Sequence, residues 1–219
     1  MRKLYLDLPY EHIEDLESYG CYFDEEVNKW CYEGNIEDYI NLCRFFMKRN
    51  EDREIGTSAI IYNNLFVLEG EIICPHCGKK TKVITFGVSD FIEYRSGEKE
   101  SINEIYQTIS EEEDFYIVNF NLLELPKYIY DYLFKKYNFE YTIEDKFYDK
   151  CQHCGKIVDY HKMSEENPFF ILFNPARVEN VKIYKIPLKY DIIVNSFDCN
   201  YDEEDYLFYL ECKMETIEL

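Results

Sequence analysis

The stretch EIICPHCGKKTKV, residues 71–83, contains two cysteines three positions apart, followed at once by a glycine and a lysine. A second copy of this pattern, DKCQHCGKIV, occupies residues 149–158. Two thiolates at this spacing can bind one metal ion from a tight turn, and a glycine after the second cysteine accepts the positive φ that the turn requires. Soft thiolate ligands favour zinc. The sequence therefore predicts one structural Zn²⁺ site with four ligands, Cys74, Cys77, Cys151 and Cys154.

The two cysteine pairs are far apart in the chain, because 73 residues lie between Cys77 and Cys151 (151 − 77 − 1). Compact four-cysteine sites usually have about 15–20 residues there. Closing the longer loop costs roughly 1.3 kcal/mol more, whereas zinc binding contributes on the order of 10 kcal/mol. We therefore interpret residues 78–150 as a large insertion in a zinc ribbon. A redox cysteine pair and an open catalytic zinc are the alternatives.

Charge is the unusual feature of the composition. The 219 residues include 44 acidic and 24 basic side chains, which gives a formal net charge of −20. A hydrophobic fraction of 47% and an aromatic fraction of 18% are enough for a folded core and exclude a disordered chain. No apolar run approaches the ~20 residues of a membrane span, and the N-terminus shows no signal-peptide pattern. We expect a cytoplasmic protein with reduced cysteines.

Hydrophobic periodicity and turn signals predict an α+β fold in two parts. Residues 1–52 are expected to form a small β-α-β-β-α module, with a strand at 3–8, a helix at 9–20, a hairpin at 21–34 and a helix at 36–50. Residues 53–219 are expected to form a zinc-ribbon α+β domain. Its expected strands are 63–73, 82–91, 115–123, 168–173, 181–187 and 189–197, and its expected helices are 102–109, 126–137 and 202–214.

Two groups of segments resemble known bacterial proteins. The segments YLDLP (5–9) and SYGCYFDEEVNKWCYEG (18–34) resemble a small module of unknown function found in plasmid primase and antirestriction-associated proteins; Gly20, Asp24 and Trp30 match its pattern, whereas Cys21 and Phe23 depart from it. Three further segments, residues 72–87, 125–160 and 168–170, are similar in order to uncharacterised bacterial proteins that join this module to an interrupted four-cysteine ribbon. The resemblance implies an architecture and brings no established activity.

Motifs of familiar catalytic machinery are missing from the sequence, which has no Gly-rich phosphate loop, no G-x-S-x-G and no H-E-x-x-H. Direct nucleic-acid binding is disfavoured because a net charge of −20 repels phosphate, although residues 79–82 with Lys135 and Lys136 would give a local basic edge. A globule of this length has a diameter of ~44 Å. Duplex DNA of that length carries about 26 phosphates, a charge of the same order as that of the protein.

We therefore expect a non-enzymatic interaction protein that docks acidic faces on a basic nucleic-acid-handling protein or nucleoprotein complex, as a phage- or plasmid-type anti-defence inhibitor would. The candidate faces are Asp24, Glu25 and Glu26; Glu111, Glu112, Glu113 and Asp114; and Asp198, Asp202, Glu203, Glu204 and Asp205. Three alternatives stay open: a nucleic-acid-binding zinc-ribbon accessory protein, an enzyme of unknown class, and an acidic surface that only solvates the protein.

Overall fold

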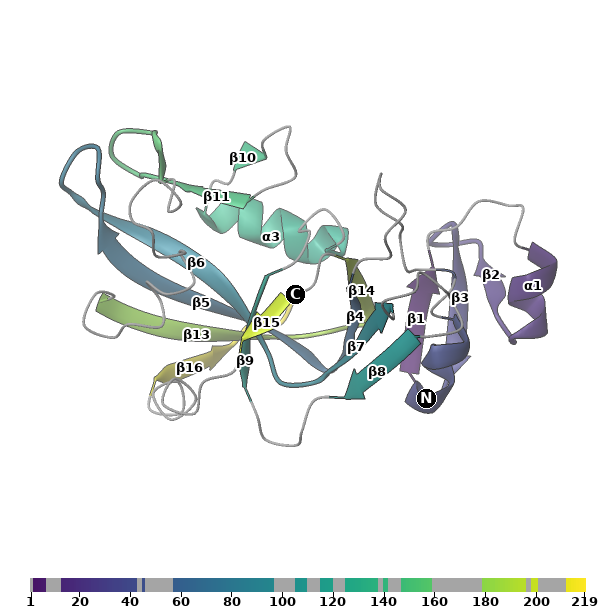
Figure 1. Ribbon diagram of the computed structural model, residues 1–219. Helices are drawn as coiled ribbons and strands as arrows, with labels where there is room; N and C mark the ends of the chain where they lie inside the picture. Colours follow the sequence, from purple (N-terminus) through teal and green to yellow (C-terminus); the bar gives the residue numbers. More distant parts are fainter. Residues whose placement is uncertain are drawn as a thin grey trace.

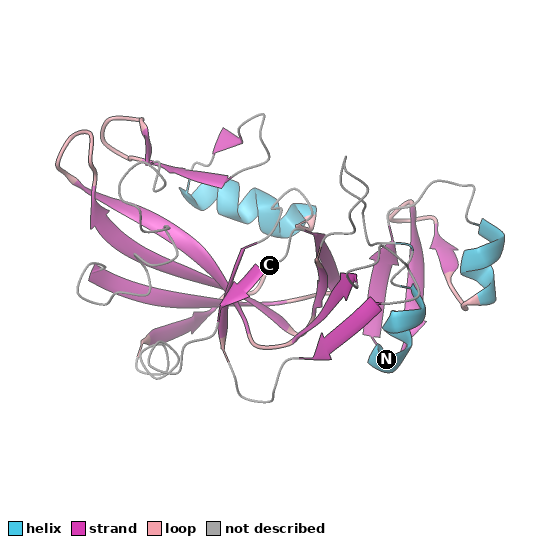
Figure 2. Ribbon diagram, in the orientation of Figure 1, coloured by secondary structure: helices cyan, strands magenta, loops and turns pink. Residues whose placement is uncertain are grey.

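Strands dominate the described part of the chain, where helix α1, the 3-10 helix η2 and helix α3 accompany them (Figures 1 and 2). The computed structural model describes residues 2–6, 13–42, 45, 57–96, 105–109, 115–119, 125–137, 140–141, 147–158, 179–195, 198–200 and 212–219. This mixed, strand-rich arrangement confirms the predicted α+β class. Within the described part of the chain, no helix is long and apolar enough to cross a membrane.

An antiparallel three-stranded sheet forms the N-terminal end of the described chain. It contains β1 (Arg2–Leu6), β2 (Tyr22–Asp24) and β3 (Lys29–Gly34), in the order β1-β3-β2. Helix α1 (Ile13–Ser18) precedes β2. Gly20, with a φ of 79°, donates its N–H to Glu17 O at 3.0 Å and ends the helix. The expected strand, helix and hairpin therefore occur in the predicted order.

The next element differs from the expected α-helix, because Ile36–Leu42 form a 3-10 helix, η2. A 3-10 helix has three residues per turn, so side chains three positions apart share a face. Ile36, Tyr39 and Leu42 have this spacing, and Tyr39 and Leu42 are buried. The β-α-β-β-α arrangement predicted for residues 1–52 is therefore not confirmed. Apart from Phe45, residues 43–50 lie outside the described part.

Two further sheets make up most of the remaining structure. The six-stranded sheet has the order β15-β9-β6-β5-β13-β16, and the four-stranded sheet has the order β14-β4-β7-β8. The strand bounds are β4 Ser58–Ile61, β5 Asn64–Ile73, β6 Lys80–Val88, β7 Phe91–Ser96, β8 Ile105–Ile109, β9 Tyr116–Asn119, β13 Glu179–Pro187, β14 Ile192–Asn195, β15 Asp198–Asn200 and β16 Lys213–Thr216. A small sheet, β10-β11-β12, contains Glu140–Tyr141, Phe147–Lys150 and Ile157–Val158.

Short corners connect neighbouring strands of the six-stranded sheet to neighbouring strands of the four-stranded sheet. The corners lie between β4 and β5, β6 and β7, and β13 and β14. Hydrogen bonds tie them together: Tyr62 N–H donates to Asp90 O at 3.0 Å, and Leu188 N–H donates to Asn63 O at 2.8 Å. Asn63 adopts a φ of 61°, as tight turns often require. The two sheets are therefore the two halves of one strongly bent arrangement (Figure 1).

Helix α3 (Lys127–Tyr137) packs on this bent arrangement through Ile129, Leu133 and Tyr137. These residues share an apolar cluster with side chains of both halves, among them Val67 of β5 and Val194 of β14. The spacing of four residues between the three helix positions places them on one face. The proline-led helix that the sequence predicts at 126–137 is confirmed.

The N-terminal sheet packs against the four-stranded half. Leu4 and Trp30 belong to the same buried cluster as Ile60 of β4 and Ile92 of β7. A partly buried ion pair crosses the same contact, since Arg2 Nη1 lies 3.1 Å from Asp191 Oδ1, and Tyr39 O–H donates to the same carboxylate at 2.7 Å. The predicted domain boundary after residue 52 lies outside the described residues, and the apolar core extends across it.

Two sequence expectations are wrong where the structure describes the chain. A helix was expected at 102–109, but Ile105–Ile109 form strand β8, which pairs with β7. A closing helix was expected at 202–214; residues 202–211 lie outside the described part, and its last two positions belong instead to β16, Lys213–Thr216, which pairs in parallel with β13. In both places hydrogen bonding to an open sheet edge overrides local helix propensity. The strand expected at 168–173 lies outside the described residues.

Gly87 of β6 provides a test of packing on the outer face of the six-stranded sheet. A Cβ at this position would overlap the ring of Phe115, which packs with Phe66 at a centroid distance of 5.2 Å. We expect Gly87→Ala to lower the free energy of unfolding by about 1–3 kcal/mol, measured by urea denaturation. Combining it with Phe115→Leu should recover part of the loss. Equal stability of Gly87→Ala and the parent protein would contradict this packing.

Candidate metal centre

The first cysteine pair lies in the turn between β5 and β6. Cys74 N–H donates to Lys79 O at 2.8 Å, and Gly78 N–H donates to Cys74 O at 2.9 Å. Gly78 has a φ of 69°, a conformation that residues with a Cβ rarely adopt. The turn therefore brings Cys77 back beside Cys74, as its spacing predicts.

The second pair, between β11 and β12, repeats this turn bond for bond. Cys151 N–H donates to Lys156 O at 2.9 Å, Gly155 N–H donates to Cys151 O at 2.9 Å, and Gly155 has a φ of 67°. The shared Cys-x-His-Cys-Gly-Lys pattern thus produces the same hydrogen bonds and nearly the same glycine φ in both turns. We call these two turns, residues 72–82 and 150–158, the knuckle arms.

The four sulfur atoms gather in one cluster, within 4.8 Å of one another. Cys74 Sγ lies 3.9 Å from Cys154 Sγ, and Cys77 Sγ lies 3.7 Å from Cys151 Sγ. A tetrahedral zinc site with Zn–S bonds of ~2.3 Å has S···S edges of about 3.8 Å, whereas a disulfide requires ~2.05 Å. The spacing therefore fits four ligands around one ion and does not fit disulfides.

The histidines of the knuckle arms hold the two arms together. His76 Nε2 lies 3.0 Å from Ile157 O, and His153 Nε2 lies 2.8 Å from Lys80 O, so each ring bonds to the main chain of the opposite arm. Gln152 N–H also donates to Thr81 Oγ1 at 3.2 Å. The identical position of the two histidines in the two sequence copies was the signal for this reciprocal contact, and only the structure shows what it does.

The cluster is half enclosed. Cys74 and Cys151 are buried among Ile72, Val83 and Val158, while Cys154 is exposed. Apolar side chains shield the two inner sulfur atoms from solvent, whereas Cys154 leaves one side of the cluster open to solvent.

Two thiols of the cluster, those of Cys151 and Cys77, have perturbed pKa values. Burial raises the pKa of Cys151, but backbone hydrogen bonds from Cys154 and His153 outweigh it and lower the pKa to about 6. A backbone hydrogen bond from Lys79 lowers the pKa of Cys77, but burial and hydrogen bonds with the neighbouring thiols together outweigh it and raise the pKa to about 11. The thiol of Cys151 therefore ionises more readily than that of Cys77.

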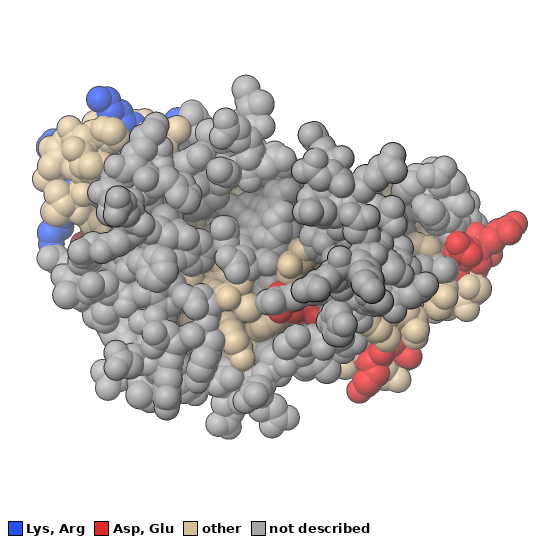
Figure 3. All heavy atoms as spheres, in the orientation of Figure 1, with Lys and Arg blue, Asp and Glu red and all other residues tan. Residues whose placement is uncertain are grey.

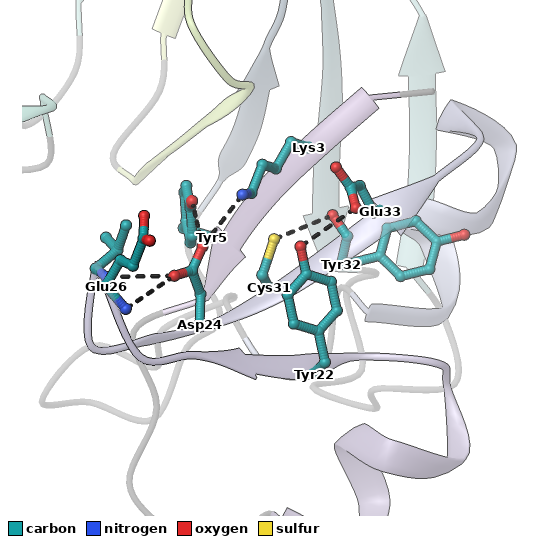
Figure 4. Close-up of polar contacts among 9 residues, drawn as sticks. Lys3, Tyr5, Tyr22, Asp24, Glu26, Cys31, Tyr32 and Glu33 are labelled. Atoms are coloured by element: carbon teal, nitrogen blue, oxygen red, sulfur yellow. Dashed lines mark hydrogen bonds and ion pairs between the residues drawn. The ribbon is translucent and has the colours of Figure 1, made fainter.

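Among the predicted acidic faces, Asp24 has a structural role (Figure 4). Its carboxylate accepts hydrogen bonds from Tyr5 O–H at 2.8 Å and from Lys3 Nζ at 3.1 Å. It also accepts the N–H of Glu26 at 3.1 Å, which closes the β2–β3 turn. The hydrogen bonds from Tyr5 and Lys3 lower the pKa of Asp24. Asp24 therefore belongs to the hairpin, whereas Glu25 and Glu26 are exposed.

For the other predicted acidic residues, the structure does not describe the side chains. Asp198 lies in β15, where the structure describes only the backbone. Glu111, Glu112, Glu113, Asp114, Asp202, Glu203, Glu204 and Asp205 lie outside the described residues.

A buried carboxylate beside α3 was not predicted from the sequence. Glu69 of β5 is only 4% exposed, yet Lys82 Nζ lies 2.7 Å from its Oε1, and Tyr137 O–H donates to its Oε2 at 2.9 Å. Lys136 Nζ lies 3.6 Å from Oε2. Burial raises the pKa of Glu69, but the hydrogen bonds from Lys82 and Tyr137 outweigh it, so the pKa lies below its ordinary value. An acidic residue inside the apolar run of β5 was the available signal.

Fold and site together define a strand-rich α+β protein in which two remote cysteine pairs meet in a candidate metal-binding cluster. No protein-family model, characterised protein or solved structure matches the chain. The resemblance of the sequence to bacterial module-and-ribbon proteins therefore stays a prediction.

Proposed function

We propose that the cysteine cluster binds one structural zinc ion. Four thiolates occupy all positions of a tetrahedral site, so no position is left for a substrate or a catalytic water. The two S···S distances of 3.7 and 3.9 Å support zinc because they lie close to the edge of about 3.8 Å of such a site. The role of the ion is to join the β5–β6 turn to the β11–β12 turn.

We propose further that the protein is a non-enzymatic interaction protein that docks on a basic nucleic-acid-handling protein or complex. The observation that carries this proposal is the concentration of exposed acidic side chains on the N-terminal sheet and helix. They are Glu14, Asp15, Glu17, Glu25, Glu26, Glu33 and Glu37. In Figure 3, red atoms lie at this end of the molecule on the face shown.

Such a surface selects a partner by charge. Closely spaced carboxylates on α1 and the β2–β3 turn attract a basic surface and speed its approach, and salt screens the attraction. Duplex phosphates present the same sign of charge, so a protein that binds DNA is the class of partner that this face fits best. An inhibitor that occupies the DNA site of a phage- or plasmid-targeting enzyme would act in this way.

The test uses paired charge-neutralising variants in a pulldown from the native host at low and high salt. We expect Glu25→Gln combined with Glu26→Gln to lose the captured basic partner, and duplex DNA to compete with the parent protein for it. Asp131→Asn combined with Glu218→Gln is the matched control, because both side chains are exposed and lie outside the N-terminal module. Equal loss in both pairs, or capture that salt does not weaken, would contradict docking through the N-terminal module.

A further inference from the structure

The contacts between the two knuckle arms follow a local two-fold symmetry. In each arm the histidine lies two positions after the first cysteine, and the carbonyl oxygen that it meets lies six positions after the first cysteine of the opposite arm. His76 thus meets Ile157 O at 3.0 Å, and His153 meets Lys80 O at 2.8 Å. The two close sulfur contacts obey the same rule, because each joins the first cysteine of one arm to the second cysteine of the other. The arms therefore meet as the two halves of a symmetric dimer interface do.

A third contact between the arms lacks a symmetric counterpart. Gln152 N–H donates to Thr81 Oγ1 at 3.2 Å. The residues at the equivalent positions are Pro75, which has no N–H, and Val158, whose side chain has no acceptor. The two histidine contacts are therefore the polar link between the arms that both copies of the motif encode.

Neither histidine is placed as a metal ligand. Among the described residues, the candidate cluster consists of the four cysteines and includes neither ring. A carbonyl oxygen can only accept a hydrogen bond, so the Nε2 of each ring carries a proton and donates it to the opposite arm. A ring nitrogen that carries a proton has no lone pair for a metal ion. The rings therefore act on the cluster through the main chain.

Each histidine directly precedes one of the two outer cysteines. His76 precedes Cys77, which is half-buried, and His153 precedes Cys154, which is exposed. The first cysteine of each arm is buried in an apolar cluster, and this packing holds the two inner sulfur atoms in place. The outer cysteines have less of this enclosure. A ring that is bonded to the opposite arm, one residue away, limits their movement instead.

Metal binding and the histidine contacts are coupled, because both require the two arms to be together. A contact that forms only when the arms meet adds its free energy to that of metal binding, and the ion strengthens the contact by the same factor. Release of the ion begins with the loss of one thiolate, and solvent reaches the cluster at Cys154. The bond from His153 to Lys80 O opposes the movement that would take this sulfur away.

We propose that His76 and His153 form a clasp that determines how tightly the cysteine cluster holds its metal ion and how slowly it releases the ion. They are positioning residues and not ligands. The inference rests on the zinc site proposed above and identifies the residues that regulate metal exchange at that site.

The test measures zinc affinity and zinc release in the full chain, by competition with a chromophoric chelator. Replacing one histidine by alanine removes one exposed hydrogen bond, so we expect the affinity to fall about two- to fivefold. The double variant, His76→Ala with His153→Ala, should lose about 4- to 25-fold and release zinc faster than either single variant. Glutamine should restore part of the affinity, because its side-chain amide can donate to the same carbonyl oxygen. The visible spectrum of the Co²⁺-loaded protein should stay that of four thiolate ligands in every variant.

The matched control is Gln152→Ala. Gln152 is an exposed residue of the second arm, and its contact to the first arm uses the main-chain N–H, which alanine keeps. This variant should bind and release zinc like the parent protein, and an equal loss in it overturns the clasp.

Unchanged affinity and release in the double histidine variant also overturn the clasp, as do glutamine variants that bind no better than the alanine variants. A changed cobalt spectrum in a single histidine variant overturns it in favour of a ligand role. A parent protein without stoichiometric metal contradicts the zinc site itself. A parent that binds zinc, with histidine variants that behave identically, contradicts the clasp alone, so the two failures are distinguishable.

Discussion

Replacing Cys154 by serine is expected to abolish stoichiometric zinc binding and to unfold the region that the two knuckle arms join. The hydroxyl is a poor ligand, so the ion retains three thiolates and loses most of its affinity. Structural zinc contributes on the order of 10 kcal/mol in small domains, so the melting temperature should fall by tens of degrees or the transition should become non-cooperative. Metal analysis of the purified protein and a thermal melt followed by circular dichroism measure both effects.

The control for this experiment is Cys212→Ser, because Cys212 is a partly buried cysteine outside the cluster. It should retain one zinc per chain. Cys74→Ser should behave like Cys154→Ser, since Cys74 Sγ lies 3.9 Å from Cys154 Sγ in the same cluster. Parent protein without stoichiometric metal, or a Cys154→Ser variant that melts at the parent temperature, would remove the basis of the zinc proposal.

Glu69→Ala is expected to destabilise the fold strongly. It leaves the ammonium groups of Lys82 and Lys136 and the hydroxyl of Tyr137 without the carboxylate that they surround. Breaking a fully buried ion pair from one side costs about 3–5 kcal/mol, and the cost here should lie near the lower end of that range because the side chains of Lys82 and Lys136 are 41% and 26% exposed. Urea denaturation measures the loss. Glu71→Ala is the matched control in the same strand, because Glu71 is half-buried, and its cost should stay near 1 kcal/mol or below.

The same carboxylate predicts a pH dependence with a definite sign. The pKa of folded Glu69 lies below its ordinary value of 4.5. Its contribution to stability is therefore complete above that value and is lost as the pH falls through the folded pKa. A Glu69→Gln variant lacks this contribution, so its free energy of unfolding should fall less steeply than that of the parent between about pH 5 and pH 3. Parallel pH profiles for the two proteins would show that Glu69 does not titrate as proposed.

The pKa of buried Asp191 shifts in the opposite direction, so its effect on stability has the opposite pH dependence. Burial raises its pKa, and the hydrogen bond from Tyr39 and the charge of Arg2 only partly compensate. Protonation of this group as the pH falls therefore favours the folded state. Because Asp191 is present in both proteins, the difference between the parent and Glu69→Gln isolates Glu69.

The local sequence pattern correctly predicted the elements whose conformation depends mainly on their own residues. The strands near 63–73 and 181–187 and the helix at 126–137 follow from short-range apolar periodicity, and the structure confirms them. Expectations failed at Ile105–Ile109 and Lys213–Thr216, where pairing with a distant strand decides the conformation. The charge of residue 69 was visible in the sequence, but its partners on β6 and α3 were not.

The sequence by itself determined both cysteine turns, because a Cys-x-x-Cys-Gly-Lys segment contains every backbone hydrogen bond and the positive φ that its geometry requires. It also determined the total charge. Only the tertiary structure decided that the two turns face one another and that Asp24 is used within its own hairpin. The physical reason is range: turn geometry depends on a few neighbouring residues, whereas convergence of segments more than 70 residues apart depends on the packing of all the strands between them.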